Sequence, residues 1–168
     1  TQGQLIQKRI AEGDKARVDA TAAKTAADEA QKVALANLEA GKVALEKAQQ
    51  QLVAAEKQLL DLTQAAKEAT EKSNAAAEAA KSAADDQDLV AAAGAAARVD
   101  QTAEAARKAA EDAVPVAKTA VAETTARVKT AELAKQEADK GVTVAVAQVA
   151  AAASVGTPQT LIEELYIC

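Results

Sequence analysis

The stretch that decides the fold is LEAGKVALEKAQQQLVAAEKQLLDL, residues 38–62. Four of its leucines recur every seven residues, and a small or apolar residue stands three positions after each of them. Apolar residues that alternate at spacings of three and four mark the line, or seam, along which two α-helices pack in a coiled coil. Because large and small residues alternate here, we expect the two helix backbones to approach closely. The four leucines are Leu38, Leu45, Leu52 and Leu59.

The seam extends in both directions from this stretch and predicts one helix over about residues 4–84. Upstream it runs through alanines, and a step of four and four residues into Leu38 predicts a stutter there. Downstream it reaches Ala83. The other predicted seam residues are Ala16, Ala20, Ala23, Ala27, Ala30, Ala34, Gly41, Ala48, Ala55, Leu62, Ala66, Ala69, Ser73, Ala76 and Ala80.

An acidic segment over residues 85–88, DDQD, interrupts this pattern and predicts a turn. Asp88 is the expected N-cap of a second helix over about residues 89–153. A second seam follows, with a step of four and four residues from Ala106 to Val114. Its predicted members are Ala96, Val99, Ala103, Ala106, Ala110, Val114, Ala117, Val121, Thr124, Val128, Ala131 and Ala138.

The two seams predict an all-α fold, a long antiparallel helical hairpin (coiled coil). Paired residues in an antiparallel hairpin have a constant sum of residue numbers. Several pairs of large residues share the sum 173, whose midpoint falls inside the expected turn, and pairs of smaller residues share the sum 172. The pairs are Leu45 with Val128, Leu52 with Val121 and Leu59 with Val114 at 173, and Gly41 with Ala131 at 172.

Two features of the second arm allow alternatives. Pro115 lies inside the predicted helix, where a proline removes one backbone hydrogen bond. This favours a kink, and the alternative is a break that begins a third helix. Residues 142–146 alternate with a strand-like period, but their alanine-rich flanks favour continued helix.

Beyond a helical hairpin over residues 1–156, the tail at 157–168 has apolar residues at helical spacing. The sequence GTP at residues 156–158 is a helix stop signal. We expect the tail to pack near the N-terminus, where the only large apolar residues are Leu5, Ile6 and Ile10.

The composition excludes several function classes. Alanine accounts for 50 of 168 residues, whereas aromatic residues make up 1%, a balance typical of long helices and coiled coils. With no His and one Cys, the usual transition-metal sites and His-dependent catalytic triads cannot form from this chain alone. The net charge of −5, with scattered basic residues, argues against nucleic acid, and no apolar run reaches the roughly 20 residues of a transmembrane helix. We expect no enzymatic activity and no cofactor.

Two groups of acidic residues are candidates for chemistry. Clustered carboxylates attract Ca²⁺, so Asp85, Asp86 and Asp88 are candidate ligands, although turn and helix-cap roles are favoured. Glu163 and Glu164 are a conceivable acid/base pair, but adjacent residues of a helix point in different directions, which favours a solvated face.

Cys168 and the threonines are the remaining candidates. Cys168 suits an intermolecular disulfide, a covalent attachment point or an unpaired thiol. Thr119 and Thr130 are eleven residues apart, as on an ice-binding face, but the other threonines do not extend the row. Ordinary surface threonines are favoured.

A seam made largely of alanine predicts partners. Burial of apolar surface contributes about 25 cal/mol per Å² to stability. Because an alanine side chain buries little apolar area, it stabilises the seam much less than a leucine does. Apolar residues beside the seam would stay in water in an isolated hairpin, which monomers avoid. We expect association with further copies or related helical proteins, as a four-helix bundle or a fibre. These flanking residues are Val33, Leu35, Val43, Val53 and Leu60.

With these heptads over residues 16–138, an acidic pI of about 4.9 and a start at Thr1 without Met, the chain resembles the trichocyst matrix proteins of protists. Those are acidic helical products that are cut from precursors and packed into extrusible fibres. The resemblance implies a secretory-granule or extracellular location, with any signal peptide already removed, and Ca²⁺-responsive packing through Asp85, Asp86 and Asp88. Without the resemblance, a cytoplasmic location is expected.

The sequence therefore predicts a non-enzymatic structural protein that self-associates through its Ala, Leu and Val seams. Three alternatives remain open. One is a surface-active helical protein that coats lipid or granule surfaces. The others are an ice-binding protein, in the style of alanine-rich antifreeze proteins, and a desiccation protectant, which the TAEAARK segment at residues 102–108 resembles.

Overall fold

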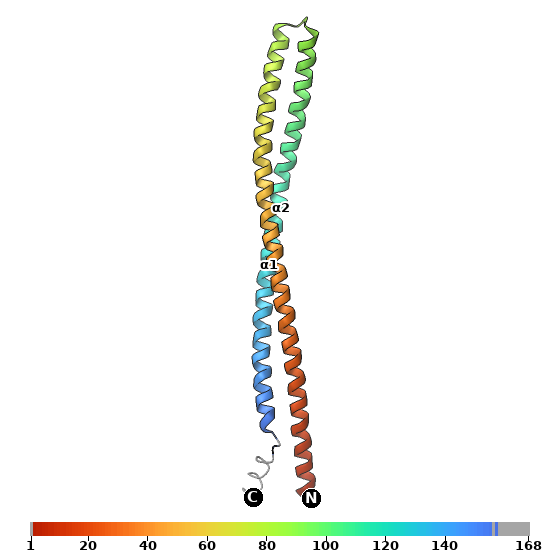
Figure 1. Ribbon diagram of the computed structural model, residues 1–168, viewed down its shortest axis with the longest axis vertical. Helices are drawn as coiled ribbons and strands as arrows, with labels where there is room; N and C mark the ends of the chain where they lie inside the picture. The colour runs from red at the N-terminus through yellow and green to blue at the C-terminus, as the bar shows by residue number, and fades with distance from the viewer. Residues whose placement is uncertain (1, 156, 158–168) are drawn as a thin grey trace. The chain divides into compact units, whose positions relative to one another are not determined.

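The computed structural model describes residues 2–155 and residue 157. Nearly all of them belong to two α-helices, α1 (Gln2–Ser82, 81 residues) and α2 (Gln87–Ser154, 68 residues). The helices are antiparallel and pack against each other, and no strand occurs within the described residues (Figure 1). The predicted all-α helical hairpin is confirmed.

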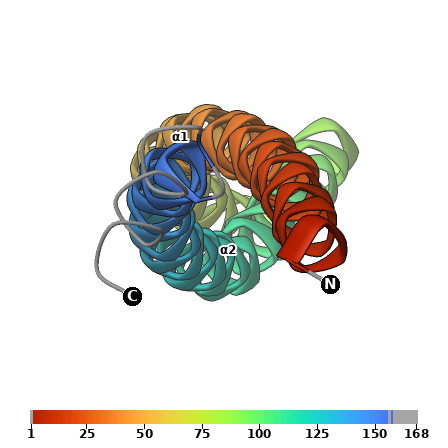
Figure 2. The ribbon, with the colours of Figure 1, turned by 90° about the horizontal axis from the view of Figure 1, so that it is seen from below.

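The chain divides into two compact units, and each contains a segment of both helices. The turn unit is Val43–Ala126, which includes the connection between α1 and α2. The terminal unit combines Thr1–Lys42 with Arg127–Cys168. Within the terminal unit, Figure 2 shows the orange part of α1 beside the blue part of α2.

Residues 83–86 form the turn, and Asp86 caps the second helix. Asp86 Oδ1 accepts hydrogen bonds from the backbone N–H groups of Asp88 (3.0 Å) and Leu89 (3.2 Å). These are donors of the first helical turn that lack a partner within the helix. The prediction that Asp88 is the N-cap is therefore wrong. Asp88 lies in the first turn of α2, where a carboxylate suits the positive end of the helix dipole.

The seam of α1 alternates between steps of four and three residues without interruption. Every position at this spacing from Ala20 to Ala83 is buried or half-buried. Two of these positions are occupied by Lys24 and Gln31, where the sequence predicted the neighbouring Ala23 and Ala30. Both alanines are exposed. The seam assignments of Ala23 and Ala30 and the stutter before Leu38 are therefore wrong. A long polar side chain can lay its methylene groups along a seam and keep its polar end in water, which an apolar pattern does not register.

The seam of α2 is also continuous, from Leu89 to Ala152. Asp100 and Arg107 occupy seam positions, whereas Val99 is 61% exposed. The seam assignment of Val99 and the step of four and four residues before Val114 are therefore wrong. Of the seven large residues predicted to form the interface, three are buried (Leu38, Val114 and Val128) and four are half-buried (Leu45, Leu52, Leu59 and Val121).

The pairing of the helices differs from the predicted register by about one helical turn. A Cβ atom on Gly41 would lie 3.3 Å from Cγ2 of Val128 and 3.9 Å from its Cα, so these two residues face each other. Their numbers add to 169, as do those of Ser82 and Gln87 on either side of the turn. The predicted sums of 172 and 173 are wrong because they set large residues opposite large ones. At Gly41 and Val128, the observed register sets a small residue against a large one.

The helix α2 continues through Pro115, so the alternative of a break that begins a third helix is wrong. The carbonyl of Pro115 accepts a hydrogen bond from the hydroxyl of Thr119 at 3.0 Å. Residues 142–146 are helical, which confirms the helical interpretation of this segment. The predicted packing of the tail lies outside the described residues. At the other terminus, Leu5 is 64% exposed and Ile10 is 41% exposed.

Two glycines allow the register to be tested through stability, because Gly41 lies in the seam and Gly94 lies on the outer surface of α2. A Cβ atom on Gly94 would have no neighbour within 4 Å, whereas one on Gly41 would press on Val128. Replacing glycine by alanine inside a helix gains about 0.8–1 kcal/mol of helix propensity. We expect Gly94→Ala to raise the free energy of unfolding by about that amount and Gly41→Ala to give no net gain. Urea denaturation at matched protein concentration checks this, and an equal gain in both variants would contradict the close approach.

Candidate functional site

The hairpin has two chemically different edges, where the flanks of its helices meet solvent. We assign heptad position a to Leu38 and position d to Gly41 in α1, and a to Val114 and d to Ala117 in α2. In an antiparallel pair, positions e of both helices line one edge beside the a residues, and positions g line the other edge beside the d residues. We call these the polar edge and the alanine edge.

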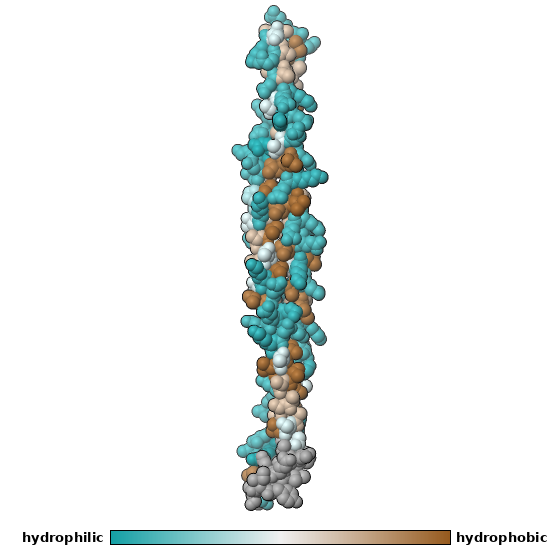
Figure 3. Space-filling view, turned by 90° about the vertical axis from the view of Figure 1, so that its left-hand side faces the viewer, coloured by the Kyte–Doolittle hydropathy of each residue, from teal (hydrophilic) through white to brown (hydrophobic). Residues whose placement is uncertain are grey.

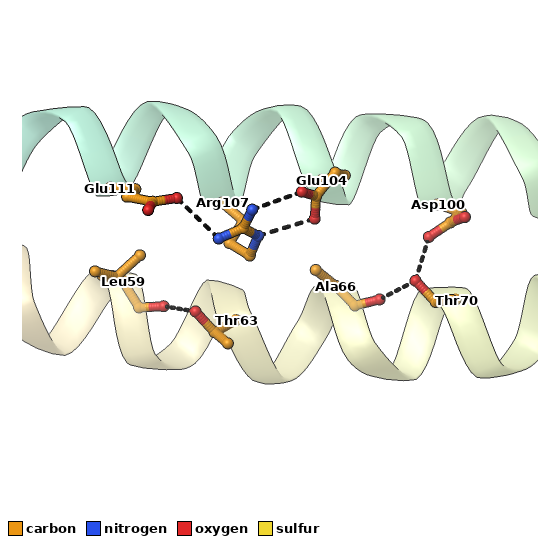
Figure 4. Close-up of polar contacts among 8 residues, drawn as sticks. All are labelled: Leu59, Thr63, Ala66, Thr70, Asp100, Glu104, Arg107 and Glu111. Atoms are coloured by element: carbon orange, nitrogen blue, oxygen red, sulfur yellow. Dashed lines mark hydrogen bonds and ion pairs between the residues drawn. The ribbon is translucent and has the colours of Figure 1, made fainter.

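The polar edge of the turn unit carries a linked set of contacts around Arg107 (Figure 4). Arg107 binds both carboxylate oxygens of Glu104, at 2.6 and 2.9 Å, and Oε2 of Glu111 at 2.9 Å. The hydrogen bonds and charge of Glu104, followed by those of Glu111, raise the pKa of Arg107. In return, the hydrogen bond from Arg107 lowers the pKa of Glu104. These contacts direct the guanidinium of Arg107, a half-buried seam residue, toward the polar edge.

Two contacts on the same edge join α1 to α2. The hydroxyl of Thr70 lies 2.7 Å from Oδ1 of Asp100 and donates to it (Figure 4). Lys118 Nζ lies 3.8 Å from Oε1 of Glu56. Both side chains of the second pair are at least half exposed, and such surface pairs contribute little to stability. The Thr70–Asp100 hydrogen bond directs the carboxylate of this seam residue toward the polar edge.

In the terminal unit the polar edge centres on Asp139. Its Oδ1 accepts from Nε2 of Gln31 at 2.8 Å, and its Oδ2 accepts from Nζ of Lys135 at 2.6 Å. The hydrogen bond from Gln31 lowers the pKa of Asp139 most, Lys135 adds to this, and desolvation opposes it. Gln31 and Lys135 are both seam residues, so this cluster satisfies polar groups that the seam would otherwise leave unpaired.

Other polar seam residues of this unit form ion pairs on the polar edge. Lys24 Nζ lies 2.6 Å from Oδ2 of Asp28, one turn further along α1. Arg17 pairs with Asp14 and also donates from Nη1 to the carbonyl of Val155 at 2.9 Å. Polar residues at a positions are known to fix the register of coiled coils, because a shifted partner would leave them unpaired.

The alanine edge of the terminal unit has a contrasting composition. Its d and g positions, over residues 16–41 of α1 and 131–155 of α2, carry no charged residue. An open groove with a volume of about 490 Å³ lies on this edge. One carboxylate and one amide in an apolar groove do not form a catalytic constellation, so the groove suits packing rather than chemistry. Its lining residues are Ala16, Asp19, Ala20, Ala23, Gln148, Ala151, Ala152 and Val155.

The five apolar residues expected beside the seam are exposed, with exposed fractions between 39% for Leu35 and 70% for Leu60. Val43, Val53 and Leu60 occupy the outer positions b and f, so they lie on the far side of α1 from the seam. The expectation that these three flank the seam is therefore wrong, and they cannot widen it. Figure 3 shows brown apolar patches between teal polar side chains on one face of the molecule.

The acidic residues, the cysteine and the threonines that the sequence offers as candidates form no metal site within the described residues. Asp86 caps α2, and no group of three or more Asp, Glu, Cys or His residues close enough to hold a metal ion occurs within the described part of the chain. Glu163, Glu164 and Cys168 lie outside the described residues. The hydroxyl of Thr119, like those of several other threonines, donates to a carbonyl of its own helix.

Neither described helix is long and apolar enough to cross a membrane. In the comparisons with known proteins, no family model, curated protein or solved structure matches this chain. The similarity to trichocyst matrix proteins therefore stays a prediction.

We expect the Asp139 cluster to make the stability of the protein depend on pH. Because the pKa of Asp139 is lowered in the folded state, its contribution is present above the unfolded pKa of about 4 and is lost as the pH falls through the folded value. We expect wild type to be more stable than Asp139→Asn at pH 6, and the difference to shrink toward pH 3. Urea midpoints measured across this range test this, with Glu29→Gln on the outer face of α1 as the control. A difference that stays constant with pH would rule out the role of the cluster.

Proposed function

We propose that the protein is a non-enzymatic structural protein whose hairpin is the building block of a larger helical assembly, either a bundle or a fibre. The observation that supports this is the distribution of its large apolar residues. Only three of them are buried among the described residues, whereas fifteen are exposed. The eleven buried apolar residues are Ala20, Ala34, Leu38, Ala48, Ala66, Ala69, Ala110, Val114, Val128, Ala145 and Ala152.

This distribution leaves a single hairpin with a weak core. Fully burying a valine or leucine side chain contributes about 1.5–3 kcal/mol, and no side chain among the described residues is fully buried. Ordering each residue costs about 1–2 kcal/mol of backbone entropy. Contacts between hairpins would bury the exposed valines and leucines and supply the missing stabilisation. This is the reason to expect a partner that is itself helical and apolar.

The similarity to trichocyst matrix proteins is consistent with this proposal, because those proteins function as packed helical material. A matrix role requires lateral contacts that repeat from one molecule to the next. The hairpin offers its exposed apolar side chains and the uncharged stretch of its alanine edge, at residues 16–41 and 131–155, for such contacts. The charged polar edge would limit which partners and which orientations fit.

Sedimentation velocity and circular dichroism over about a hundredfold dilution test the proposal. We expect a mass that is a multiple of 17.1 kDa at high concentration, and a melting temperature that rises with concentration, because assembly stabilises the folded state. A folded monomer at every concentration, with a constant melting temperature, would overturn the proposal. Monomers that bind lipid vesicles with a gain of helix would instead support the surface-coating alternative.

A further inference from the structure

We propose that a second copy of this chain docks on the alanine edge of the terminal unit, so that two hairpins pair edge to edge. This inference rests on the proposed self-association and specifies the face that is used. The edge is formed by the g positions Ala16, Ala23 and Ala30 of α1 and Ala134, Gly141 and Gln148 of α2. Five of these residues are exposed and Ala16 is half-buried.

The charges of the terminal unit indicate what can cover this edge. The ion pairs and hydrogen bonds of Lys24, Gln31 and Asp139 lie toward the opposite, polar edge, as does the ion pair of Arg17 with Asp14. Arg17 also donates to the backbone carbonyl of Val155, a g residue that lines the groove. Over residues 16–41 and 131–155, an occupant of the alanine edge therefore meets no charged side chain at the d and g positions, and burying its own charges there would be costly. Arg127, the next g position, lies beyond this stretch and limits it. The same edge of another copy is equally uncharged. With a two-fold axis between the copies, the same uncharged edge of each copy would cover that of the other, as in most homodimers.

The shape of the edge also fits a second helix pair. The groove of about 490 Å³ lies at the end of the edge that contains Ala23 and Ala152. Val33 and Val144, at the neighbouring c positions, are 60% and 56% exposed. Each copy thus presents large side chains beside a surface of small ones, which is what interdigitating helices require.

The area of the edge is sufficient for a stable contact. Residues 16–41 extend over about 38 Å at 1.5 Å per residue, and two helices side by side are about 20 Å wide. The face therefore measures roughly 750 Å², close to the roughly 800 Å² per partner of a standard protein interface. Asp19 and Glu137 border this face and would mark its limits.

Gly141 gives a specific test, because a Cβ atom there would have no neighbour within 4 Å. Gly141→Arg adds a charged side chain that a single hairpin can accept, but that would lie inside the proposed contact. We expect this variant to weaken self-association roughly tenfold or more in sedimentation equilibrium. The matched control is Gly94→Arg, the same change in the same helix at an outer b position that is also open. The control should associate like wild type.

Thiol protection gives a second readout that does not depend on a disruptive variant. In a Cys168→Ser background, Ala30→Cys places a thiol on the alanine edge and Ala36→Cys places one on the outer face of α1. On raising the protein concentration, maleimide labelling should slow for Ala30→Cys and stay constant for Ala36→Cys.

The outcomes separate the two proposals. A chain that stays monomeric throughout overturns self-association itself. A chain that assembles, but in which Gly141→Arg behaves like Gly94→Arg and Ala30→Cys stays reactive, overturns only the alanine-edge contact. Loss of association in Gly141→Arg alone, together with protection of Ala30→Cys, supports it.

Discussion

The structure depends on one packing constraint, which is that a small residue of one helix faces a large residue of the other. Gly41 against Val128 shows how close this brings the backbones, since even a methyl group on Gly41 would lie only 3.3 Å from Val128. In the same register, the repeat of seven residues sets Leu52 and Val114 against alanines, whereas nearer the turn small residues face each other. This packing explains how a chain with so few large buried residues still forms a continuous seam, and why that seam supplies little stability by itself.

The same constraint separates the surface into two kinds. The a positions hold the larger residues, including the polar Gln31, Asp100, Arg107 and Lys135, and these direct their polar ends to the polar edge. The d positions are almost all small, and the g positions beside them are uncharged over residues 16–41 of α1 and 131–155 of α2. In the terminal unit one edge is therefore occupied by contacts within the chain, whereas residues 16–41 and 131–155 leave the other edge uncharged and open. This asymmetry connects the internal packing of the hairpin to its proposed assembly.

Much of the fold follows from the sequence, because the heptads of Leu38 and Val114 and the polar segment after Ala84 are strong local signals. The register does not follow from them, because a shift of about one helical turn still sets one seam against the other. The polar seam residues were missed for a related reason. Alanines stand next to Lys24 and Gln31, so a search for apolar residues chooses the alanine.

The N-cap of α2 is Asp86, two residues before the predicted Asp88, because an aspartate at either position is an equally good N-cap in sequence alone. For the alanine edge, a signal was present in the sequence as the absence of charge at every g position from Ala16 to Ala44.

Disulfide formation between engineered cysteines tests the register most directly. In a Cys168→Ser background, one variant combines Gly41→Cys with Val128→Cys, and the other combines Gly41→Cys with Ala131→Cys. The account predicts rapid intramolecular oxidation of the first pair, since Gly41 and Val128 are within bridging distance, and slow oxidation of the second. Faster oxidation of the pair at 41 and 131 would contradict the small-against-large register.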